Sequence, residues 1–592
     1  MKKDKYKAFN IKNIKPQGWI EDQLKTQLNS SLSHLYNYWP SIKDSVFVGG
    51  DNKDYERVPY FLDGYIPLVY LLDDKQGKKV INKYVNGIIN NQLEDGNFKY
   101  LNNEDTDMWN VIIILKSLTT YASITNKSLI INVIYKGLKA LYNNLNKYKL
   151  KDWGEYRWFE ALIPIYYIYN LKKEDWLIDL AYLLHDQGFD YYNYYLTSFP
   201  KKDVGKGVWN LMSHGVNHAM AIKCYSLYYK LTNNKEELKK TKYMINKLYK
   251  YHGVVTGTFN ADECLASNNP SRGSELCLIV EAMYSFEWLI KIEGKDKYID
   301  MLERLAFNAL LSAFSNDMNT HQYDNQVNAP FIIKNNKTLW NSNNEYANLY
   351  GLEPNFGCCT ANFHQGLPKF VASSILKSKN ELFICSYIPV KIKDKDYDIN
   401  IDSYYPFDNK IKITINSNKE KKIRFHLINN KDIIINDKKY ENKKGNVVFT
   451  LNKGLNIFNI IINDKPEFII KRNNVSLINN NLVYALKIKE KKEKIDEYNY
   501  EYHNLSYPSY ILKDLQYETI IHEVDKNKSP FVSLKPYIEY KLKAYKTDYK
   551  IIGNYLISKN KIINNKEEDV SFIPIAINKL HLGNIKFIKN KK

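Results

Sequence analysis

The sequence predicts a multidomain α plus β protein in which an (α/α)6 barrel or toroid is followed by C-terminal antiparallel β-sandwich domains. Three observations lead to this fold class. Between about residues 55 and 315, apolar residues recur at helical spacing in one segment after another. Beyond about residue 380 they alternate with polar residues, as in half-buried strands. All nine tryptophans lie at or before Trp340, so the two halves also differ in composition.

The helical half begins with the apolar segment 55–72. An apolar stripe of helical period follows, and short polar turns such as TNK and KKED separate the later segments. No convincing strand lies between them, which indicates antiparallel helical hairpins. A fixed repeat period is absent, so a closed ring is favoured over a solenoid. The stripe is Val80, Ile81, Tyr84, Val85, Ile88 and Ile89, and the later segments are 110–122, 129–146, 155–169, 176–187, 217–231, 235–250, 275–293 and 298–315.

The β half shows period-two patterns. Ile411, Ile413 and Ile415 alternate with polar residues, and Ile423 and Phe425 repeat the pattern. Asn, Asp, Gly and Lys pairs separate further β-forming runs. We expect two sandwich modules joined near residues 470–480. The predicted domains are therefore a barrel domain at 1–378, a β-sandwich at 379–475 and a second β-sandwich at 476–592.

Composition limits the function classes. A chain of 592 residues is too long to fold around one hydrophobic core, and its composition is that of a globular protein. The net charge of +20 comes from lysines scattered along the chain, which favours a solvated lysine surface over a nucleic-acid site. The first residues lack an apolar signal core, and no apolar run is long enough for a membrane span. We expect a cytoplasmic protein with no nucleic-acid or membrane partner.

Six cysteines are too few for a disulfide scaffold, and three of them suggest a metal site instead. Glu275 and Cys277 lie in GSELC, and Cys358 and Cys359 lie in FGCCTANFHQG. Three thiols and one carboxylate can fill a tetrahedral Zn²⁺ site. The alternatives are a chance cysteine pair with Cys277 buried as an apolar residue, and a strained disulfide between Cys358 and Cys359.

The spacing of Glu275 and Cys277 restricts their backbone. Residues two apart point to different faces of a helix, so these two converge only in extended chain or at a helix start. Ser274 is a plausible N-cap, and Gly294 ends the following helical pattern. Cys277 would then occupy the first turn, where the helix dipole favours a thiolate.

Two carboxylates precede this motif. Asp262 and Glu263 lie in an irregular loop rich in Asn, Pro and Gly, and such a position suits general acid/base work beside a metal. The alternative is a pair of solvated loop carboxylates. Cys264 adjoins them and is expected to pack as a bystander, while Cys224 and Cys385 belong to core segments.

Imidazole and amide groups supply candidates for binding sugar hydroxyls. His214 and His218 are four apart and would share one helix face, and without a third ligand nearby hydrogen bonding is favoured over metal binding. Tryptophans 109, 153, 158 and 209 could form flat apolar platforms, although most are expected in the core. The predicted hydroxyl-binding residues are His214, His218, His321, Gln322 and His364.

These motifs resemble glycoside hydrolase family 127, the β-L-arabinofuranosidases formerly known as a domain of unknown function. The matching stretches cover roughly residues 15–375. They include ERVPYFLDGYIPLVYLLDD at 56–74, WGEYRWFEALIPIYYIYN at 153–170, HGVNHAMAIK at 214–223, DECLASNNPSRGSELC at 262–277, HQYDNQVN at 321–328 and LEPNFGCCTANFHQGLPKF at 352–370.

The resemblance implies an (α/α)6 barrel followed by β-sandwich domains, with a zinc ion held by Glu275, Cys277, Cys358 and Cys359. It also implies that Cys358 is the nucleophile, because the first cysteine of the family's pair has that role. Two departures mark a divergent branch. The family's acid/base Gly-Glu aligns near Gly257, which leaves Glu263 as the substitute, and the family's Cys-Cys-Pro-Pro-Asn is Cys-Cys-Thr-Ala-Asn here.

We therefore expect a zinc-dependent retaining glycoside hydrolase in which Cys358 attacks the sugar and Glu263 is the acid/base. Its substrate would be a terminal β-L-arabinofuranoside or similar sugar on a glycan or glycoconjugate. Two other hypotheses remain at this point: an (α/α)6 polysaccharide lyase, and a non-catalytic carbohydrate-binding protein stapled by zinc.

Overall fold

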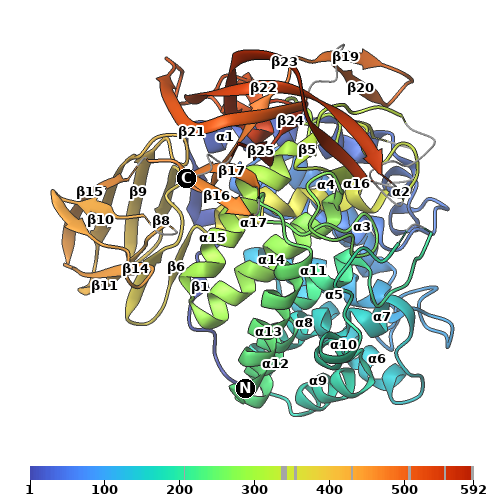
Figure 1. Cartoon of the computed structure of the whole chain (residues 1–592). Coiled ribbons are helices and arrows are strands. Elements are labelled where there is room, and N and C mark those ends of the chain that lie inside the picture. Colours follow the sequence, from blue (N-terminus) through green and yellow to red (C-terminus); the bar gives the residue numbers. More distant parts are fainter. Residues whose placement is uncertain are drawn as a thin grey trace.

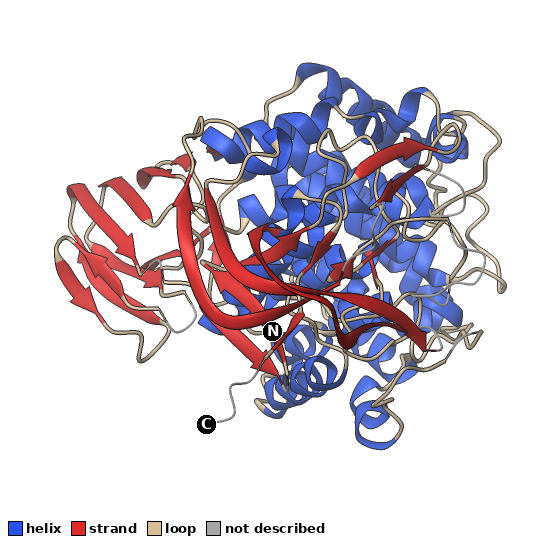
Figure 2. Cartoon of the chain, turned by 45° about the horizontal axis from the view of Figure 1, so that its top comes forward, coloured by secondary structure: helices blue, strands red, loops and turns tan. Residues whose placement is uncertain are grey.

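The computed structural model describes residues 1–205, 207–334, 343–352, 357–428, 431–463, 465–471, 473–504, 509–552 and 555–588. Trp340 and Phe356, which belong to stretches singled out in the sequence, lie outside these ranges. Figure 1 shows a helical body, a β-sandwich beside it, and long curved strands across its top. In Figure 2 these strands pass in front of the helices.

The helical body is a closed ring. Its inner helices contact one another in sequence: α3 meets α5, α5 meets α8, α11 and α12 meet α14, α14 meets α17, and α17 returns to α3. A short 3₁₀ segment, η4, contacts both α8 and α12. The bounds of these helices are Arg57–Leu71 (α3), Met108–Thr125 (α5), Trp158–Ala161 (η4), Leu162–Lys172 (α8), Gly215–Ala221 (α11), Cys224–Thr232 (α12), Leu276–Glu293 (α14) and Gly366–Ala372 (α17).

The outer helices differ from the inner ones in their pattern of burial. Helix α5 is apolar around almost its whole circumference, whereas α4 buries one stripe and exposes charged residues on the other side. This contrast is expected when an inner ring is enclosed by an amphipathic outer ring. The outer helices are Lys75–Asn90 (α4), Ser128–Leu145 (α6), Trp176–Gln187 (α9), Glu236–Tyr251 (α13) and Asp296–Arg304 (α15).

Shorter helices connect the ring or attach to it. They are Gly18–Asn29 (α1), Pro40–Lys43 (α2), Asp152–Tyr156 (α7), Tyr191–Thr197 (α10), Gly357–Asn362 (α16) and Pro530–Ser533 (α18). The 3₁₀ segments are Ile11–Asn13 (η1), Ser31–Asn37 (η2), Val46–Val48 (η3), Phe363–Gln365 (η6) and Ile575–Ile577 (η7), and Leu305–Leu310 (η5) is a π-helical turn.

The predicted barrel is confirmed, and two helical segments differ in detail. The segment expected at 217–231 is two helices, and the break lies beside Lys223, whose Nζ donates to the carbonyl of Met220 (3.3 Å). The segment expected at 298–315 ends in the π-helical turn η5, where Asn308 donates to the carbonyl of Arg304 and to that of Asn481 (2.8 Å each). In η5, a side-chain bond to a distant segment thus accompanies a change in a helix that periodicity alone makes continuous.

The first β module is a sandwich of two sheets. One has the strand order β1-β6-β7-β11-β14 and the other β13-β12-β15-β10-β9-β8-β2. Phe425 of β11 and Phe458 of β15 pack edge-on between them at 5.0 Å. The bounds are Ile375–Lys377 (β6), Glu381–Ile384 (β7), Val390–Lys393 (β8), Tyr397–Ser403 (β9), Lys410–Ser417 (β10), Lys421–His426 (β11), Ile433–Ile435 (β12), Lys438–Tyr440 (β13), Asn446–Leu451 (β14) and Gly454–Ile462 (β15).

Two features of this sandwich are absent from the sequence pattern. Strands β11 and β7 pair in parallel, although the other described pairs of the sandwich are antiparallel. The first residues of the chain also join the sandwich. Strand β1 (Lys7–Ala8) pairs with β6, and β2 (Ile14–Pro16) pairs with β8. The barrel domain and the first β module are therefore interwoven through these two strands.

The second β module is built differently from the predicted second sandwich. Its main strands form one nine-stranded sheet, β16-β17-β25-β21-β22-β23-β18-β24-β5, which includes Asn328–Ala329 (β5) from the helical half. Strand β18 contacts η5 of the barrel, so this sheet packs on helices. The other strands are Glu467–Lys471 (β16), Asn474–Asn479 (β17), Leu482–Lys487 (β18), Ser509–Ile521 (β21), Ile538–Ile552 (β22), Tyr555–Pro574 (β23), His581–Leu582 (β24) and Ile585–Phe587 (β25), with Lys491–Lys494 (β19) and Tyr500–His503 (β20) as a separate hairpin.

Trp19 of α1 joins all three parts. Its ring packs edge-on against Phe307 of the barrel (6.2 Å), Phe407 of the first β module (5.1 Å) and Phe531 of the second (6.1 Å). Its indole N–H donates to the carbonyl of Tyr405 (2.8 Å). Aromatic side chains bury large areas, so this contact favours a fixed arrangement of the three parts.

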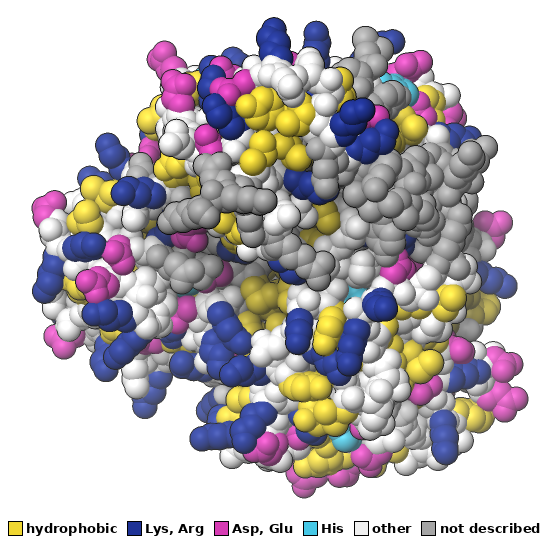
Figure 3. Space-filling model, viewed as in Figure 1, with side chains coloured by type: hydrophobic (Ala, Val, Ile, Leu, Met, Phe, Trp, Pro, Cys, Tyr) yellow, Lys and Arg dark blue, Asp and Glu magenta, His cyan; other side chains and the backbone are white. Residues whose placement is uncertain are grey.

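The surface agrees with the interpretation of the positive charge. On the face shown in Figure 3, lysine and arginine side chains are dispersed among acidic and uncharged ones. None of the helices in the described ranges is both long and apolar enough to span a bilayer.

A buried histidine ties the barrel to the first β module. His426 of β11 lies 3.1 Å from a carboxylate oxygen of Asp300 and 3.4 Å from one of Asp296, both on α15. Burial alone would lower the pKa of His426, but the carboxylates of Asp300 and Asp296 raise it to about 10. The imidazolium therefore stabilises this interface.

The ion pairs of His426 with Asp296 and Asp300 make a pH-dependent contribution to stability. An unfolded histidine titrates near pH 6.5, so the contribution is complete below that pH and is lost as the pH rises toward about 10. We expect His426→Gln to lower the melting temperature most at pH 6, where the free energy of unfolding should fall by a value on the order of 3–5 kcal/mol. Thermal unfolding of both proteins at pH 6, 8 and 10 checks this. The difference in melting temperature should shrink with rising pH, and a constant difference would contradict the assignment.

Candidate active site

The two cysteine-bearing stretches each begin a helix. Glu275 ends the short strand β3 (Ser274–Glu275), which pairs with β4 (Asp324–Asn325), and Cys277 follows in the first turn of α14. Cys358 is the second residue of α16. The predicted combination of extended chain and helix start is therefore present. The predicted N-cap is wrong: Glu275 occupies that position, and the hydroxyl of Ser274 instead donates to the carbonyl of Phe259 (3.1 Å).

The structure brings the four predicted metal ligands together. One donor atom from each of Glu275, Cys277, Cys358 and Cys359 lies within 4.8 Å of the others. The backbone N–H of Cys277 also donates to the Cys359 thiol (3.3 Å). Cys264, Cys224 and Cys385 are buried elsewhere and are not part of this group.

The electrostatics of this group favour a bound cation. Burial raises the pKa of Glu275, Cys277 and Cys359 well above their usual values, and neighbouring acidic groups raise it further. Hydrogen bonds from the thiols of Cys277 and Cys359 lower the pKa of Cys358, and the Arg57 guanidinium lowers it further. One oxygen of Glu275, Oε2, is buried and has no hydrogen-bond partner in the described part of the chain. A soft divalent ion would satisfy this oxygen and the three sulfurs, so the residues fit a metal site.

Glu263 lies next to this group at the wall of the site. A carboxylate oxygen of Glu263, a ring nitrogen of His214 and a carboxylate oxygen of Glu275 lie within 4.8 Å of one another. His214 contacts Glu263 at 3.1 Å, Tyr323 donates its hydroxyl at 2.6 Å, and Trp209 donates its indole N–H at 3.3 Å. Burial opposes ionisation of Glu263, but the hydrogen bonds from His214 and Tyr323 lower its pKa.

The backbone of Glu263 is strained. Its φ is +129°, a value that side-chain-bearing residues rarely adopt. The neighbouring carboxylate, Asp262, is buried and receives a hydrogen bond from Arg272 (2.6 Å). Strained residues concentrate at functional sites, where the surrounding structure holds them in place. The pair predicted from the loop thus separates into a partly exposed carboxylate at the site and a buried ion-pair partner.

Aromatic rings and an arginine form the adjoining wall. The guanidinium of Arg157 lies 4.6 Å from the ring centre of Trp109 and 4.3 Å from that of Trp153. Trp153 in turn packs edge-on against His214 at 5.1 Å. Trp209 is 54% exposed and offers a free face beside Glu263. Flat rings beside hydrogen-bonding groups suit recognition of a sugar.

A cavity of about 500 Å³ adjoins Cys358 from the other side. Its wall includes Trp39, Arg57, Gly357 and Tyr498, the last from the chain between β19 and β20. Arg57 forms an ion pair with Glu56, and Glu56 also accepts the indole N–H of Trp109 (2.7 Å). Arg57 on the cavity wall is thus connected through Glu56 to Trp109 on the aromatic wall of the site.

The predicted hydroxyl-binding residues lie in different places. His214 is at the site, but it is the N-cap of α11 with extended backbone and not part of the helix. It therefore does not share a helix face with His218, whose ring bonds to Tyr195 (3.0 Å) and to the carbonyl of Met212 (2.9 Å). The expectation of one shared face is wrong for this reason.

The remaining three residues are buried and engaged with protein atoms. His321 lies 2.9 Å from the hydroxyl of Thr360, and Gln322 donates to the carbonyl of Asn348 (2.6 Å). His364 packs edge-on against Phe61 at 5.1 Å. Their contact with a substrate stays a prediction. Arg157, Tyr323 and Arg57 were not singled out in the sequence, because no spacing rule links them to the cysteine motifs.

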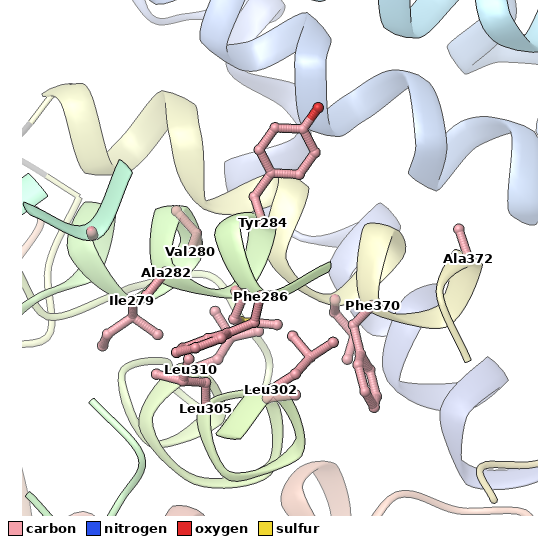
Figure 4. Close-up of a cluster of buried hydrophobic side chains, with 14 of the residues drawn as sticks. Ile279, Val280, Ala282, Tyr284, Phe286, Leu302, Leu305, Leu310, Phe370 and Ala372 are labelled. Atoms are coloured by element: carbon pink, nitrogen blue, oxygen red, sulfur yellow. The ribbon is translucent and has the colours of Figure 1, made fainter. Parts of the chain in front are cut away.

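One face of α14 connects the site to the interior of the barrel. Cys277, Glu281, Tyr284 and Trp288 follow at helical spacing and share this face. In Figure 4, Tyr284 points away from the apolar cluster of α14 that contains Phe286. Glu281 accepts hydrogen bonds from Asn362 (3.1 Å) and Gln365 (2.9 Å), which lie three and six residues after Cys359. The helix α14 thereby fixes both halves of the metal-ligand group.

Glu281 belongs to a buried ion cluster at the centre of the ring. Lys116 lies 3.1 Å from Glu160, 3.7 Å from Glu281 and 3.8 Å from Asp63. Lys369 lies 2.7 Å from Asp63, and Lys223 pairs with Glu160. The cluster thus contains three lysines and three carboxylates from six segments of the barrel: Asp63, Lys116, Glu160, Lys223, Glu281 and Lys369.

Known proteins share this fold. Residues 13–372 match the family described as Beta-L-arabinofuranosidase, GH127 catalytic domain. No curated protein sequence matches the chain. A solved structure described as a glycoside hydrolase superposes with a TM-score of 0.74 at 14% identity, covering 99% of this chain and 98% of the other. A GH127 β-arabinofuranosidase gives 0.73 at 14% identity with coverage of 99% and 98%, and a GH127 β-L-arabinofuranosidase from Geobacillus stearothermophilus T6 gives 0.71 at 14% with 97% and 100%.

The helical ring, the trailing β modules and the family match together define a glycosidase that acts on a carbohydrate substrate. The chain belongs to glycoside hydrolase family 127, since the family match covers more than half of its residues. The resemblance seen in the sequence is thereby confirmed.

Proposed function

We propose that this protein is a retaining, exo-acting glycosidase that releases a terminal β-L-arabinofuranosyl or similar residue from a glycan or glycoconjugate. Cys358 is the nucleophile and Glu263 the acid/base. Glu275, Cys277, Cys358 and Cys359 hold a zinc ion. The observation that carries the proposal is the convergence of the four-ligand group and the Glu263–His214 pair on one carboxylate, Glu275.

The chemistry proceeds in two steps. The thiolate of Cys358 attacks the anomeric carbon while the glycosidic C–O bond breaks, and the carboxyl group of Glu263 gives its proton to the departing oxygen. Glu263, now a carboxylate, takes a proton from water. The water oxygen attacks the anomeric carbon, the C–S bond breaks, and the thiolate of Cys358 is restored. Two inversions at one carbon retain the configuration.

Neighbouring residues tune Glu263 for the second step. Hydrogen bonds from His214 and Tyr323 lower its pKa and so favour the carboxylate that the second step needs. Its 27% exposed side chain lets substrate or water reach the oxygens. A bound zinc ion would keep the thiols deprotonated at neutral pH.

Glu263→Gln tests the acid/base role through the leaving group. Without a proton donor, alkyl β-L-arabinofuranosides should lose roughly 10²- to 10⁴-fold in kcat/KM. The 4-nitrophenyl glycoside should lose much less in kcat/KM, because its leaving group departs without protonation. Its kcat should fall, since water is no longer activated, and glycosylated Cys358 should accumulate in mass spectra.

The control is Glu94→Gln, which neutralises an exposed carboxylate outside the site and should leave both substrates unaffected. An equal loss of kcat/KM on both substrates by Glu263→Gln would count against its role as proton donor. Failure of the wild-type protein to hydrolyse any β-L-arabinofuranoside would instead disprove the proposed sugar.

A further inference from the structure

A separate cavity of about 540 Å³ lies between the barrel and the nine-stranded sheet. Its wall is formed by the turn at 253–255, the loop at 267–270, Arg304 at the end of α15, and residues of β16 and β17. Its volume falls within the roughly 300–1,000 Å³ range of small-molecule sites. None of the residues assigned above to catalysis or metal binding lines it.

Arg304 is the one arginine of the described wall, and its charge lacks an ion-pair partner. No carboxylate in the described part of the chain lies within ion-pair distance of its guanidinium, and its buried Nε has no hydrogen-bond partner there. Burial lowers the pKa of Arg304, while Asp300 and Glu467 act on it only from a longer range. The Arg304 side chain is half-buried, but its Nε is buried and has no partner in the described part of the chain, so an anion in the cavity could supply that partner.

The rest of the wall mixes apolar and polar side chains and carries no negative charge among its described residues. Lys471 adds a second positive charge. Asn268, Asn474 and Asn584 contribute amides, and Ser476 contributes a hydroxyl that already accepts a hydrogen bond from Asn584 (3.0 Å). A guanidinium binds carboxylate and phosphate through paired N–H groups, and amides suit hydroxyl groups.

We propose that this cavity binds a small hydroxylated oxyanion, either a sugar acid or a sugar phosphate. The guanidinium of Arg304 holds the carboxylate or phosphate, Lys471 supplements the charge, and the asparagine amides bind the hydroxyls. The site is distinct from the one that cleaves glycosides, so it does not depend on the sugar proposed above.

The position of the cavity connects it to catalysis. The loop at 267–270 lies between Glu263 and Glu275 in the chain. The backbone N–H of Ser267 donates to the His252 ring (2.9 Å), and the Asn260 side chain donates to the carbonyl of Asn269 (2.7 Å). An anion bound against this loop would restrict the segment that carries both carboxylates. Binding should therefore also raise the melting temperature of the barrel.

Isothermal titration calorimetry on the full chain tests the site with four probes: D-glucuronate, D-ribose 5-phosphate, inorganic phosphate and neutral L-arabinose. We expect one or both of the first two to bind and L-arabinose not to bind at this site. Arg304→Gln should weaken that binding roughly 10- to 100-fold, because a charge-assisted pair is lost. Arg304→Lys keeps the charge without the paired N–H groups and should give a smaller loss.

Lys471→Met changes an exposed residue and keeps the proposal testable if Arg304→Gln does not fold; a several-fold weaker affinity is expected. Lys239→Met, an exposed lysine far from the wall, serves as the matched control and should bind like the wild type. Absence of binding by both acidic sugars, or equal binding by wild type and Arg304→Gln, would overturn the site. Inorganic phosphate that binds as tightly as ribose 5-phosphate would overturn the role of the amides.

Discussion

Replacement of Cys358 by alanine is expected to lower kcat by about 10⁴- to 10⁶-fold, the loss seen when a covalent nucleophile is removed. The thiol occupies the start of α16, beside Arg57 and within 4.8 Å of three other donor atoms. Of the cysteines, which all lie in the described ranges, Cys358 is partly exposed and the other five are buried. Initial-rate measurements on a terminal β-L-arabinofuranoside, with circular dichroism to verify folding, give the answer.

Two matched variants separate the nucleophile from the metal ligands. Cys359→Ala removes one ligand of the same group, so its activity should recover in part with added zinc, whereas Cys358→Ala should stay inactive. Cys385→Ala removes a buried thiol outside the site and should keep full activity. Elemental analysis of each protein reports whether metal was lost. More than a few per cent of wild-type activity in Cys358→Ala would refute the assigned role.

The second large effect concerns the buried ion cluster. Lys116→Met should destabilise the barrel by about 3–5 kcal/mol, because it leaves three buried carboxylates with only two lysines, Lys223 and Lys369. Lys116 is fully buried, and its pKa is raised well above the usual value by Glu160, Glu281 and Asp63 although burial opposes this. Methionine has a similar shape, so the loss reflects charge more than packing.

The double variant Lys116→Met with Glu160→Gln restores the balance of charge and should recover part of the loss. Thermal and urea unfolding of Lys116→Met, Glu160→Gln and the double variant measure this coupling. Lys239→Met, at a 73% exposed side chain, should change stability little. If the double variant were as unstable as the sum of the two single variants, the charge argument would be wrong.

The helical half was predictable from the sequence because its signals are local. The stripe of α4 and the stop at Gly294, which adopts φ of +67° and donates to the carbonyl of Ile290 (2.9 Å), follow from spacing and from glycine chemistry. The grouping of Glu275, Cys277, Cys358 and Cys359 was predictable as well, because three thiols and one carboxylate in two short motifs suit a metal ion.

Contacts between distant segments were not predictable. The parallel pairing of β11 with β7 leaves the alternation of Ile423 and Phe425 unchanged, so the pattern cannot reveal it. His214 and His218 have helical spacing, yet His214 lies outside the helix because it caps α11 and turns toward Glu263. The strain at Glu263 and the placement of Arg157 between two tryptophans likewise depend on tertiary structure.

The pairing of β1 and β2 has a consequence for biosynthesis. Ala8 finds its partner in Leu376, and Ile14 in Ile392, so neither can pair until most of the chain has left the ribosome. At about 5–20 residues per second, this delay lasts roughly 20–75 s. During that time the unpaired backbones of β1 and β2 and the apolar side of the nascent barrel are accessible to chaperones. Expression of the isolated helical half would leave β1 and β2 without their partner strands.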